Sequence, residues 1–207
     1  MRQVSRWAAK QPVRVIIRLG LSVALAAVLP PGENLVAADP APNASEFTVA
    51  SGQLSLAAPP DWKRVRPRSM IVETEFSVPA VGDDKQPGRL TVMGAGGSIE
   101  ANIDRWYGQF SQPDGSATKD KAAVKKLKVA GCTVTLVDVA GTYKDMPGGP
   151  FAGGRTIERP DYRMLAAIIE TGDAGNYFLK LYGPAATVGK SADGFRKMVE
   201  GMVAAGN

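Results

Sequence analysis

The chain has 207 residues, with 25 basic and 20 acidic side chains, no histidine and one cysteine. The lack of histidine excludes Ser-His-Asp and Cys-His catalysis and imidazole zinc sites, and one cysteine cannot form an internal disulfide. Carboxylate or lysine chemistry and calcium binding through oxygen ligands stay open. No motif indicates a catalytic residue, a cofactor or a metal ligand, so we expect a protein that is not an enzyme.

The first 38 residues have the features of an export signal. Five basic residues lie between Arg2 and Arg18, an uncharged apolar run occupies residues 19–29, and small residues precede Asp39. The run of 11 residues is about half of the ~20 that a membrane-spanning helix needs. We therefore expect cleavage after Ala38, a periplasmic or secreted product and no stable membrane span afterwards. An uncleaved N-terminal anchor and an organelle transit peptide are the alternatives.

Removal of this segment changes the charge of the protein. Residues 1–38 hold five of the 25 basic and one of the 20 acidic side chains, so the net charge falls from +5 to +1. Nucleic-acid binding thereby loses its electrostatic support. The remaining length is typical of one domain with a hydrophobic core of its own. The predicted organisation is a signal peptide at 1–38, a flexible leader at 39–45 and a single domain at 46–207.

The first half of this domain contains strand patterns and one helix. Two short strands are expected within residues 46–58, and a turn at Pro59-Pro60-Asp61 follows. Residues 69–78 alternate, which predicts a strand with one buried face. The predicted buried side chains are Met70, Val72, Thr74, Phe76 and Val78, and the predicted outward ones are Ile71, Glu73 and Glu75.

A short strand is expected at residues 89–93, and a helix at 98–110. The helix has an apolar stripe of Ile99, Ile103, Trp106 and Phe110. The second half of the domain predicts a hairpin of strands 124–129 and 132–143, with apolar residues on both faces of the second strand.

Two more strands, 163–170 and 176–183, are joined by a turn, and a terminal helix at 191–205 is capped by Ser191. The short hairpins predict an α+β fold: a mainly antiparallel β-sheet flanked by helices, that is, an αβα sandwich.

Several strings in this order resemble the fold family of PsbP and Mog1, and more narrowly uncharacterised exported bacterial proteins of that type. They are LAAPPDW at 56–62, WYGQF at 106–110 and FLKLYGP at 178–184, followed by Phe195 and Met198 in the last helix. The resemblance covers most of residues 46–205. It implies an αβα sandwich and a non-enzymatic docking or accessory role, and it implies no ligand residue.

A long segment rich in Gly and Pro, residues 144–161, is the candidate partner-contact loop. A structureless loop of such length is uncommon in a compact domain and is often functional. Met146, Phe151 and Ile157 would be partly exposed apolar residues beside Arg155 and Arg159, a mixture that suits a partner surface. The expected partner is an unknown protein or a cell-envelope component. A mobile hairpin connection is the alternative interpretation.

Two further function classes stay open. A carboxylate-dependent hydrolase acting on envelope glycans would need two carboxylates about 5–10 Å apart in a cleft. A small-ligand carrier would need a closed apolar pocket beneath the sheet. A basic cluster after Trp62, made of Lys63, Arg64, Arg66 and Arg68, suits either an anionic surface such as lipid or a solvated sheet edge.

Overall fold

The computed structural model describes residues 45–147 and 155–205. The predicted signal peptide and residues 39–44 of the predicted leader lie outside the described residues, as does Phe151. No helix in the described part of the chain is long and apolar enough to cross a membrane.

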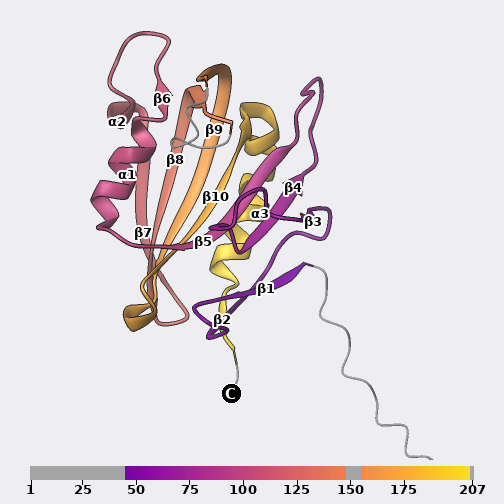
Figure 1. The fold of residues 1–207 in the computed structure, drawn as a ribbon, viewed down its shortest axis with the longest axis vertical. Helices are drawn as coiled ribbons and strands as arrows, with labels where there is room; N and C mark the ends of the chain where they lie inside the picture. The colour runs from indigo at the N-terminus through magenta and orange to yellow at the C-terminus, as the bar shows by residue number, and fades with distance from the viewer. Residues whose placement is uncertain (1–44, 148–154, 206–207) are drawn as a thin grey trace, which may run out of the picture. The chain divides into compact units, whose positions relative to one another are not determined.

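Strands dominate the domain (Figure 1). The strands are β1 (Glu46–Val49), β2 (Leu54–Ala57), β3 (Lys63–Val65), β4 (Thr74–Val78), β5 (Gly88–Ala95), β6 (Phe110–Ser111), β7 (Ala123–Val129), β8 (Cys132–Asp145), β9 (Ile157–Glu170), β10 (Asn176–Pro184) and β11 (Val203–Ala204). The helices are α1 (Ile99–Tyr107), α2 (Thr118–Lys121), α3 (Ala185–Glu200) and a 3-10 turn, η1 (Gly172–Ala174).

The main sheet has the strand order β3-β4-β5-β10-β9-β8-β6, and β7 also pairs with β8. All of these pairs are antiparallel. A second, small sheet joins β1, β2 and β11. This architecture confirms the predicted α+β class.

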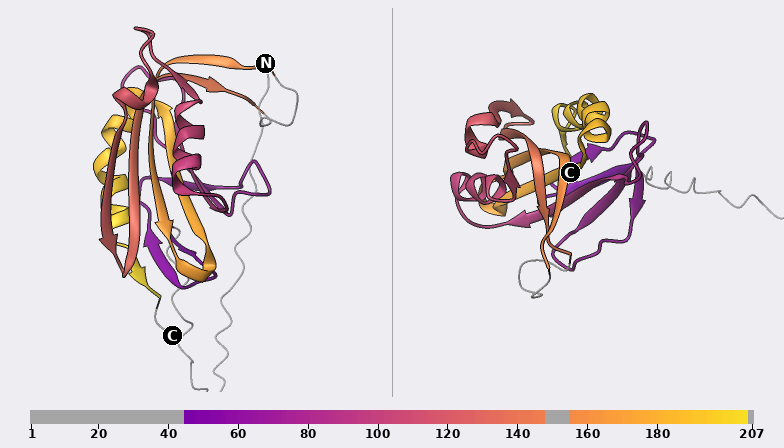
Figure 2. Two further views of the ribbon diagram at one scale, coloured as in Figure 1. Left: turned by 90° about the vertical axis from the view of Figure 1, so that its left-hand side faces the viewer. Right: turned by 90° about the horizontal axis from the view of Figure 1, so that it is seen from above.

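The alternation of side chains along β9 divides the hydrophobic core into two. Residues 165, 167 and 169 belong to the cluster that includes the apolar side of α3. Residues 164, 166 and 168 belong to the cluster that includes Ile103 and Trp106 of α1. Because successive strand residues point to opposite faces, α1 and α3 cover opposite faces of one sheet, as Figure 2 shows. The predicted αβα sandwich is confirmed.

The candidate partner-contact loop is shorter than predicted. Strand β8 extends to Asp145 and β9 begins at Ile157, so only residues 146–156 lie between them. Pro160 and Asp161 look like loop residues in the sequence, but they lie at a register shift in the β8–β9 pair, where Asp161 has φ 55°. A β-bulge accepts a proline and bends its strand. Beyond this bulge the hairpin bends out on the α1 side of the sheet (Figure 2).

The strand predicted at 69–78 is also partly wrong. Strand β4 starts only at Thr74, and the N–H of Val72 donates to the carbonyl of Ser69 in a turn. Met70, predicted to be buried, is fully exposed, whereas Glu75, predicted to face solvent, is 1% exposed. Strand propensity at 69–73 was overridden by this turn, and Glu75 is buried because it has a cationic partner, described below.

The last helix starts earlier than predicted. It follows β10 directly at Ala185 and ends at Glu200, and residues 203–204 form β11 instead of a helical turn. The start is stabilised by Asp84 from the β4–β5 loop, which accepts from the Thr187 N–H at 3.0 Å and from the Thr187 hydroxyl at 2.6 Å. This cap satisfies a free N–H of the first turn. Ser191 therefore lies inside the helix and does not cap it.

Candidate functional site

A cavity of about 820 Å³ lies on the face of the main sheet that also carries α1. Phe178 on β10 packs in the α1 core, and Lys180 and Tyr182 follow it at intervals of two, so they share its face. The floor of the cavity comes from β4, β5 and β10. Its walls come from the loop between β3 and β4, the bent β8–β9 hairpin and Gln109 after α1.

The charged side chains of the lining are mostly basic. Six basic residues and two acidic ones line the cavity. They are Arg66, Arg68, Arg89, Lys144, Arg159 and Lys180, with Glu75 and Asp145 as the acidic pair. Both carboxylates are ion-paired: Glu75 with Arg89 at 2.8 Å and Asp145 with Arg159 at 3.1 Å.

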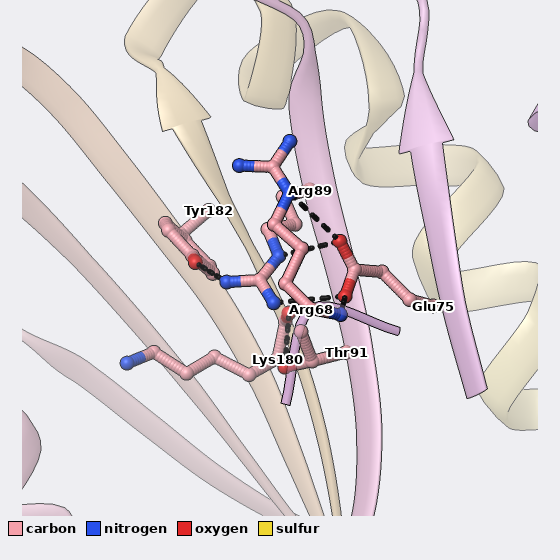
Figure 3. Close-up of polar contacts among 6 residues, drawn as sticks. All are labelled: Arg68, Glu75, Arg89, Thr91, Lys180 and Tyr182. Carbon is pink, nitrogen blue, oxygen red and sulfur yellow. Dashed lines mark hydrogen bonds and ion pairs between the residues drawn. The ribbon is translucent and has the colours of Figure 1, made fainter. Parts of the chain in front are cut away.

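The Glu75–Arg89 pair forms the centre of the floor (Figure 3). Arg89 donates from Nε and Nη2 to the two carboxylate oxygens of Glu75, each at 2.8 Å. The backbone N–H of Arg68 donates to the same carboxylate at 3.0 Å, and Arg89 also donates to the Tyr182 hydroxyl. This bidentate geometry is the strong form of an arginine–carboxylate contact.

The protonation of this pair follows from its partners. Burial by itself raises the pKa of Glu75, but the hydrogen bonds from Arg89 and from the Arg68 N–H outweigh it, and the pKa is lowered. Burial by itself lowers the pKa of Arg89, and the hydrogen bond to Glu75 more than reverses this, so that pKa is raised. Both groups therefore stay charged, and Glu75 cannot serve as a general acid near neutral pH.

Lys180 is a cavity residue with a strongly shifted pKa. Its amine donates to Oε1 of Gln109 and lies 5.7 Å from the Tyr143 ring centroid and 5.3 Å from that of Tyr182. In Figure 3 its side chain extends away from the Glu75 carboxylate. Burial lowers the pKa of Lys180 to about 7, and the charges of Arg105 and Arg89 add to the effect. The amine thus changes its charge near neutral pH.

Three tyrosines form the aromatic part of the wall. The rings of Tyr143 and Tyr162 stack with centroids 6.0 Å apart, and the ring of Tyr182 lies 5.4 Å from that of Tyr143. Burial raises the pKa of Tyr143, of Tyr162 and of Tyr182. Their hydroxyls therefore stay protonated and can act as hydrogen-bond donors.

The structure brings two of the five predicted contact residues to this cavity. Met146 and Arg159 line it. Ile157 is 37% exposed on β9, and Arg155 is exposed before that strand. Phe151 lies outside the described residues.

The charged floor was missed from the sequence. Glu75, Arg89, Lys180 and Tyr182 come from three strands and carry no motif. The available signal was a single charged residue in each strand: Glu75, Arg89 and Lys180. Lys180 falls between Leu179 and Leu181, which face the other core. A lysine on the same strand face as Phe178 and Tyr182 indicates a polar patch on an otherwise buried face.

The lining of the cavity can be compared with what a glycan hydrolase, a metal site or a small-ligand carrier would need. The two carboxylates that line the cavity are both held by arginines, which does not favour the acid–base pair of a glycan hydrolase. Within the described residues there is no cluster of acidic or cysteine side chains that could hold a metal ion. The charged lining also differs from the closed apolar pocket that a carrier of apolar ligands needs.

Comparisons with known proteins give two similar folds. No protein-family model and no curated protein matches the chain. The solution structure of cyanobacterial PsbP from Synechocystis sp. PCC 6803 has 10% identity and a TM-score of 0.46, over 78% of this chain and 93% of that one. A crystal structure of PA94 from Pseudomonas aeruginosa, described as a protein of unknown function and putative regulator, has 11% identity and a TM-score of 0.40, over 75% and 92%. The first is a PsbP protein, the family that the sequence resembles. Neither similarity bears on the function of this chain.

Proposed function

We propose that this chain is an exported, non-enzymatic binding domain whose cavity takes a negatively charged group of its ligand or partner. One observation carries the proposal: six basic side chains line the cavity against two carboxylates, and both carboxylates are already paired. Among the described residues, no carboxylate lies within ion-pair distance of Arg66, Lys144 or Lys180. These cations are available to an incoming anion.

The donors suit a phosphate or a carboxylate. Lys180 offers a point charge, and Arg66 offers a planar guanidinium. The raised pKa values of Tyr143 and Tyr182 keep their hydroxyls as donors. Charge-assisted hydrogen bonds from such groups are about twice as strong as neutral ones. An anion with an apolar or aromatic body would also contact the tyrosine wall.

The proposal favours binding over catalysis. Histidine is absent from the sequence, and the pKa of Glu75 is lowered by its partners, so Glu75 does not exchange protons as a carboxylic acid near neutral pH. Among the described residues that line the cavity, Lys180 has a pKa lowered to about 7. Its position supports charge recognition, because a bound anion would hold it in the protonated form.

The hairpin contributes to the partner surface in this proposal. Met146 and Arg159 line the cavity, and Ile157 is exposed on the same hairpin. A ligand group that enters the cavity from a larger partner would therefore also touch the hairpin. The export segment at residues 1–38 supports a partner in the cell envelope.

The test is calorimetric titration with glycerol phosphate as the phosphate probe and succinate as the carboxylate probe. An anion beside Lys180 raises the pKa of this amine, so at about pH 8 binding must take up a proton. The measured heat then depends on the ionisation enthalpy of the buffer. We expect Lys180→Gln to bind about tenfold more weakly, a difference of about 1.4 kcal/mol, and to lose the proton uptake.

The matched control is Lys125→Gln, which removes an exposed lysine on β7 away from the cavity. It should bind like the unmodified protein. The proposal is wrong if neither anion binds, or if Lys180→Gln and Lys125→Gln bind equally well.

A further inference from the structure

Exposed apolar side chains are concentrated at the rim of the cavity. Three of the six exposed large hydrophobic residues in the described chain lie within seven positions, as Val65, Met70 and Ile71. Met70 is fully exposed and Ile71 is 71% exposed. Val65 and Ile71 line the cavity itself. We name residues 66–72 the rim loop.

The rim loop is held in place at its base. The Val72 N–H donates to the Ser69 carbonyl at 3.2 Å, and the Arg68 N–H donates to the buried carboxylate of Glu75 at 3.0 Å. The buried ion pair of the floor therefore anchors the loop that carries Met70 and Ile71. Both side chains keep apolar surface in contact with water, so covering that surface would be favourable.

Positive charge surrounds this apolar tip. Arg66 and Arg68 lie on the rim loop, and the side chain of Arg68 is 75% exposed. Lys144 and Arg159 stand on the hairpin wall of the same cavity. An anionic bilayer attracts nearby lysine and arginine side chains, and apolar side chains flanked by basic ones insert at its headgroup boundary.

We propose that the rim loop docks this domain on an anionic membrane surface, with Met70 and Ile71 inserted among the acyl chains and a lipid phosphate in the basic cavity. This inference rests on the proposed function, since it names the source of the anion. Two adjacent apolar side chains are too small a patch for a stable protein interface of ~800 Å² per partner. Together with the surrounding cations they suffice for reversible membrane binding.

The test is co-sedimentation with vesicles of phosphatidylcholine, with and without phosphatidylglycerol. The unit Pro40–Asn207 is compact and contains both hydrophobic cores, so it is used in place of the full chain to keep residues 1–39 from binding lipid. We expect binding to the phosphatidylglycerol vesicles only. The double variant Met70→Ser/Ile71→Ser should bind them at least about tenfold more weakly yet bind glycerol phosphate unchanged.

The matched control is Val124→Ser, which removes a 48% exposed valine from β7 and should leave vesicle binding unchanged. Equal vesicle binding by the double variant, or equal binding to vesicles without phosphatidylglycerol, overturns the inference. Binding of glycerol phosphate without any vesicle binding also overturns it and leaves the proposed function standing. Vesicle binding that depends on Met70 and Ile71, without binding of either glycerol phosphate or succinate, supports docking by the rim loop and overturns the proposed function of the cavity.

Discussion

The two faces of the main sheet are built from the same strands but differ in how they are covered. On the face of α3, 16 helical residues cover an apolar surface that includes Leu179 and Leu181. On the other face, the nine residues of α1 cover only part of the strands, and the cavity with Arg89 and Lys180 occupies another part. One sheet thus combines a face that α3 covers, here called the closed face, with a face that carries the charged cavity, here called the open face.

Strand β10 contains this contrast within consecutive residues. Leu179 and Leu181 are fully buried in the α3 core. Lys180, between them, points to the cavity with Tyr182. The strict alternation of a strand separates the two environments by one residue, so a substitution on one face leaves the other face in place.

The largest effect should come from the buried ion pair of the open face. Glu75→Gln leaves Arg89 without its charge partner, and breaking a buried pair costs about 3–5 kcal/mol. The control is Asp193→Asn, which removes an exposed pair with Arg196 worth at most about 1 kcal/mol. Urea unfolding measures both. If the two variants lose similar amounts of unfolding free energy, the Glu75–Arg89 pair does not stabilise the fold more than an exposed ion pair does.

The closed face should lose slightly less from the truncation of one of its fully buried leucines. Leu181→Ala leaves a cavity under α3 and should cost about 2–5 kcal/mol of unfolding free energy. Lys180→Ala, at the next position on the opposite face, should cost under about 1 kcal/mol, because the amine is already poorly solvated there. Thermal or urea unfolding of the two variants tests this. Equal losses of unfolding free energy would contradict the view that the closed face stabilises the domain more than the open face does.

The unfolding free energy of the domain should depend on pH through Lys180 on the open face. The amine has a pKa of 10.5 when unperturbed and about 7 in the folded domain. Between these values the unfolded chain binds more protons, so this lysine makes the domain more stable as pH rises. Lys180→Met should be the more stable variant at about pH 6, by roughly 1–3 kcal/mol, and this advantage should shrink by about pH 9. A constant difference across this range, measured by urea unfolding, would contradict the buried position of the amine.

The smallest effect should come from the cap of α3 on the closed face. Asp84→Ala removes the acceptor of the Thr187 N–H and should cost about 1 kcal/mol. Asp83→Ala, one residue earlier and exposed, is the matched control and should change the stability little. An equal effect of the two substitutions on the urea midpoint would mean that the cap does not stabilise the helix.

The sequence by itself determined most of the elements and the class of the fold. Alternation predicted β5, the β7–β8 hairpin and the β9–β10 pair, because strand period and turn residues are local properties. The apolar stripe of Ile103 and Trp106 placed α1. Apolar residues on both faces of β8 predicted a strand covered on each side, and both core clusters contain its valines.

Of the candidate site, the sequence indicated the hairpin and its residues Met146 and Arg159 but not the cavity floor. From the local sequence alone, a charged residue in a strand is expected to be exposed to solvent. Glu75 is buried because Arg89, 14 residues away, meets it across the β4–β5 pair. An ion pair between two strands cannot be recognised from the local sequence, because only the register of the sheet brings its two residues together.

Tertiary structure alone also decided where the hairpin bends and where α3 begins. The register shift between Gly141 and Tyr143 makes Pro160 a strand residue although it looks like a loop residue in the sequence, and Asp84 caps a helix at Thr187, 103 positions later. At the helix, the Thr187 N–H is satisfied by a carboxylate from a distant loop, and this contact overrides the local preference for a cap at Ser191. The closed face could therefore be predicted from periodicity, whereas the open face with its cavity required the assembled sheet.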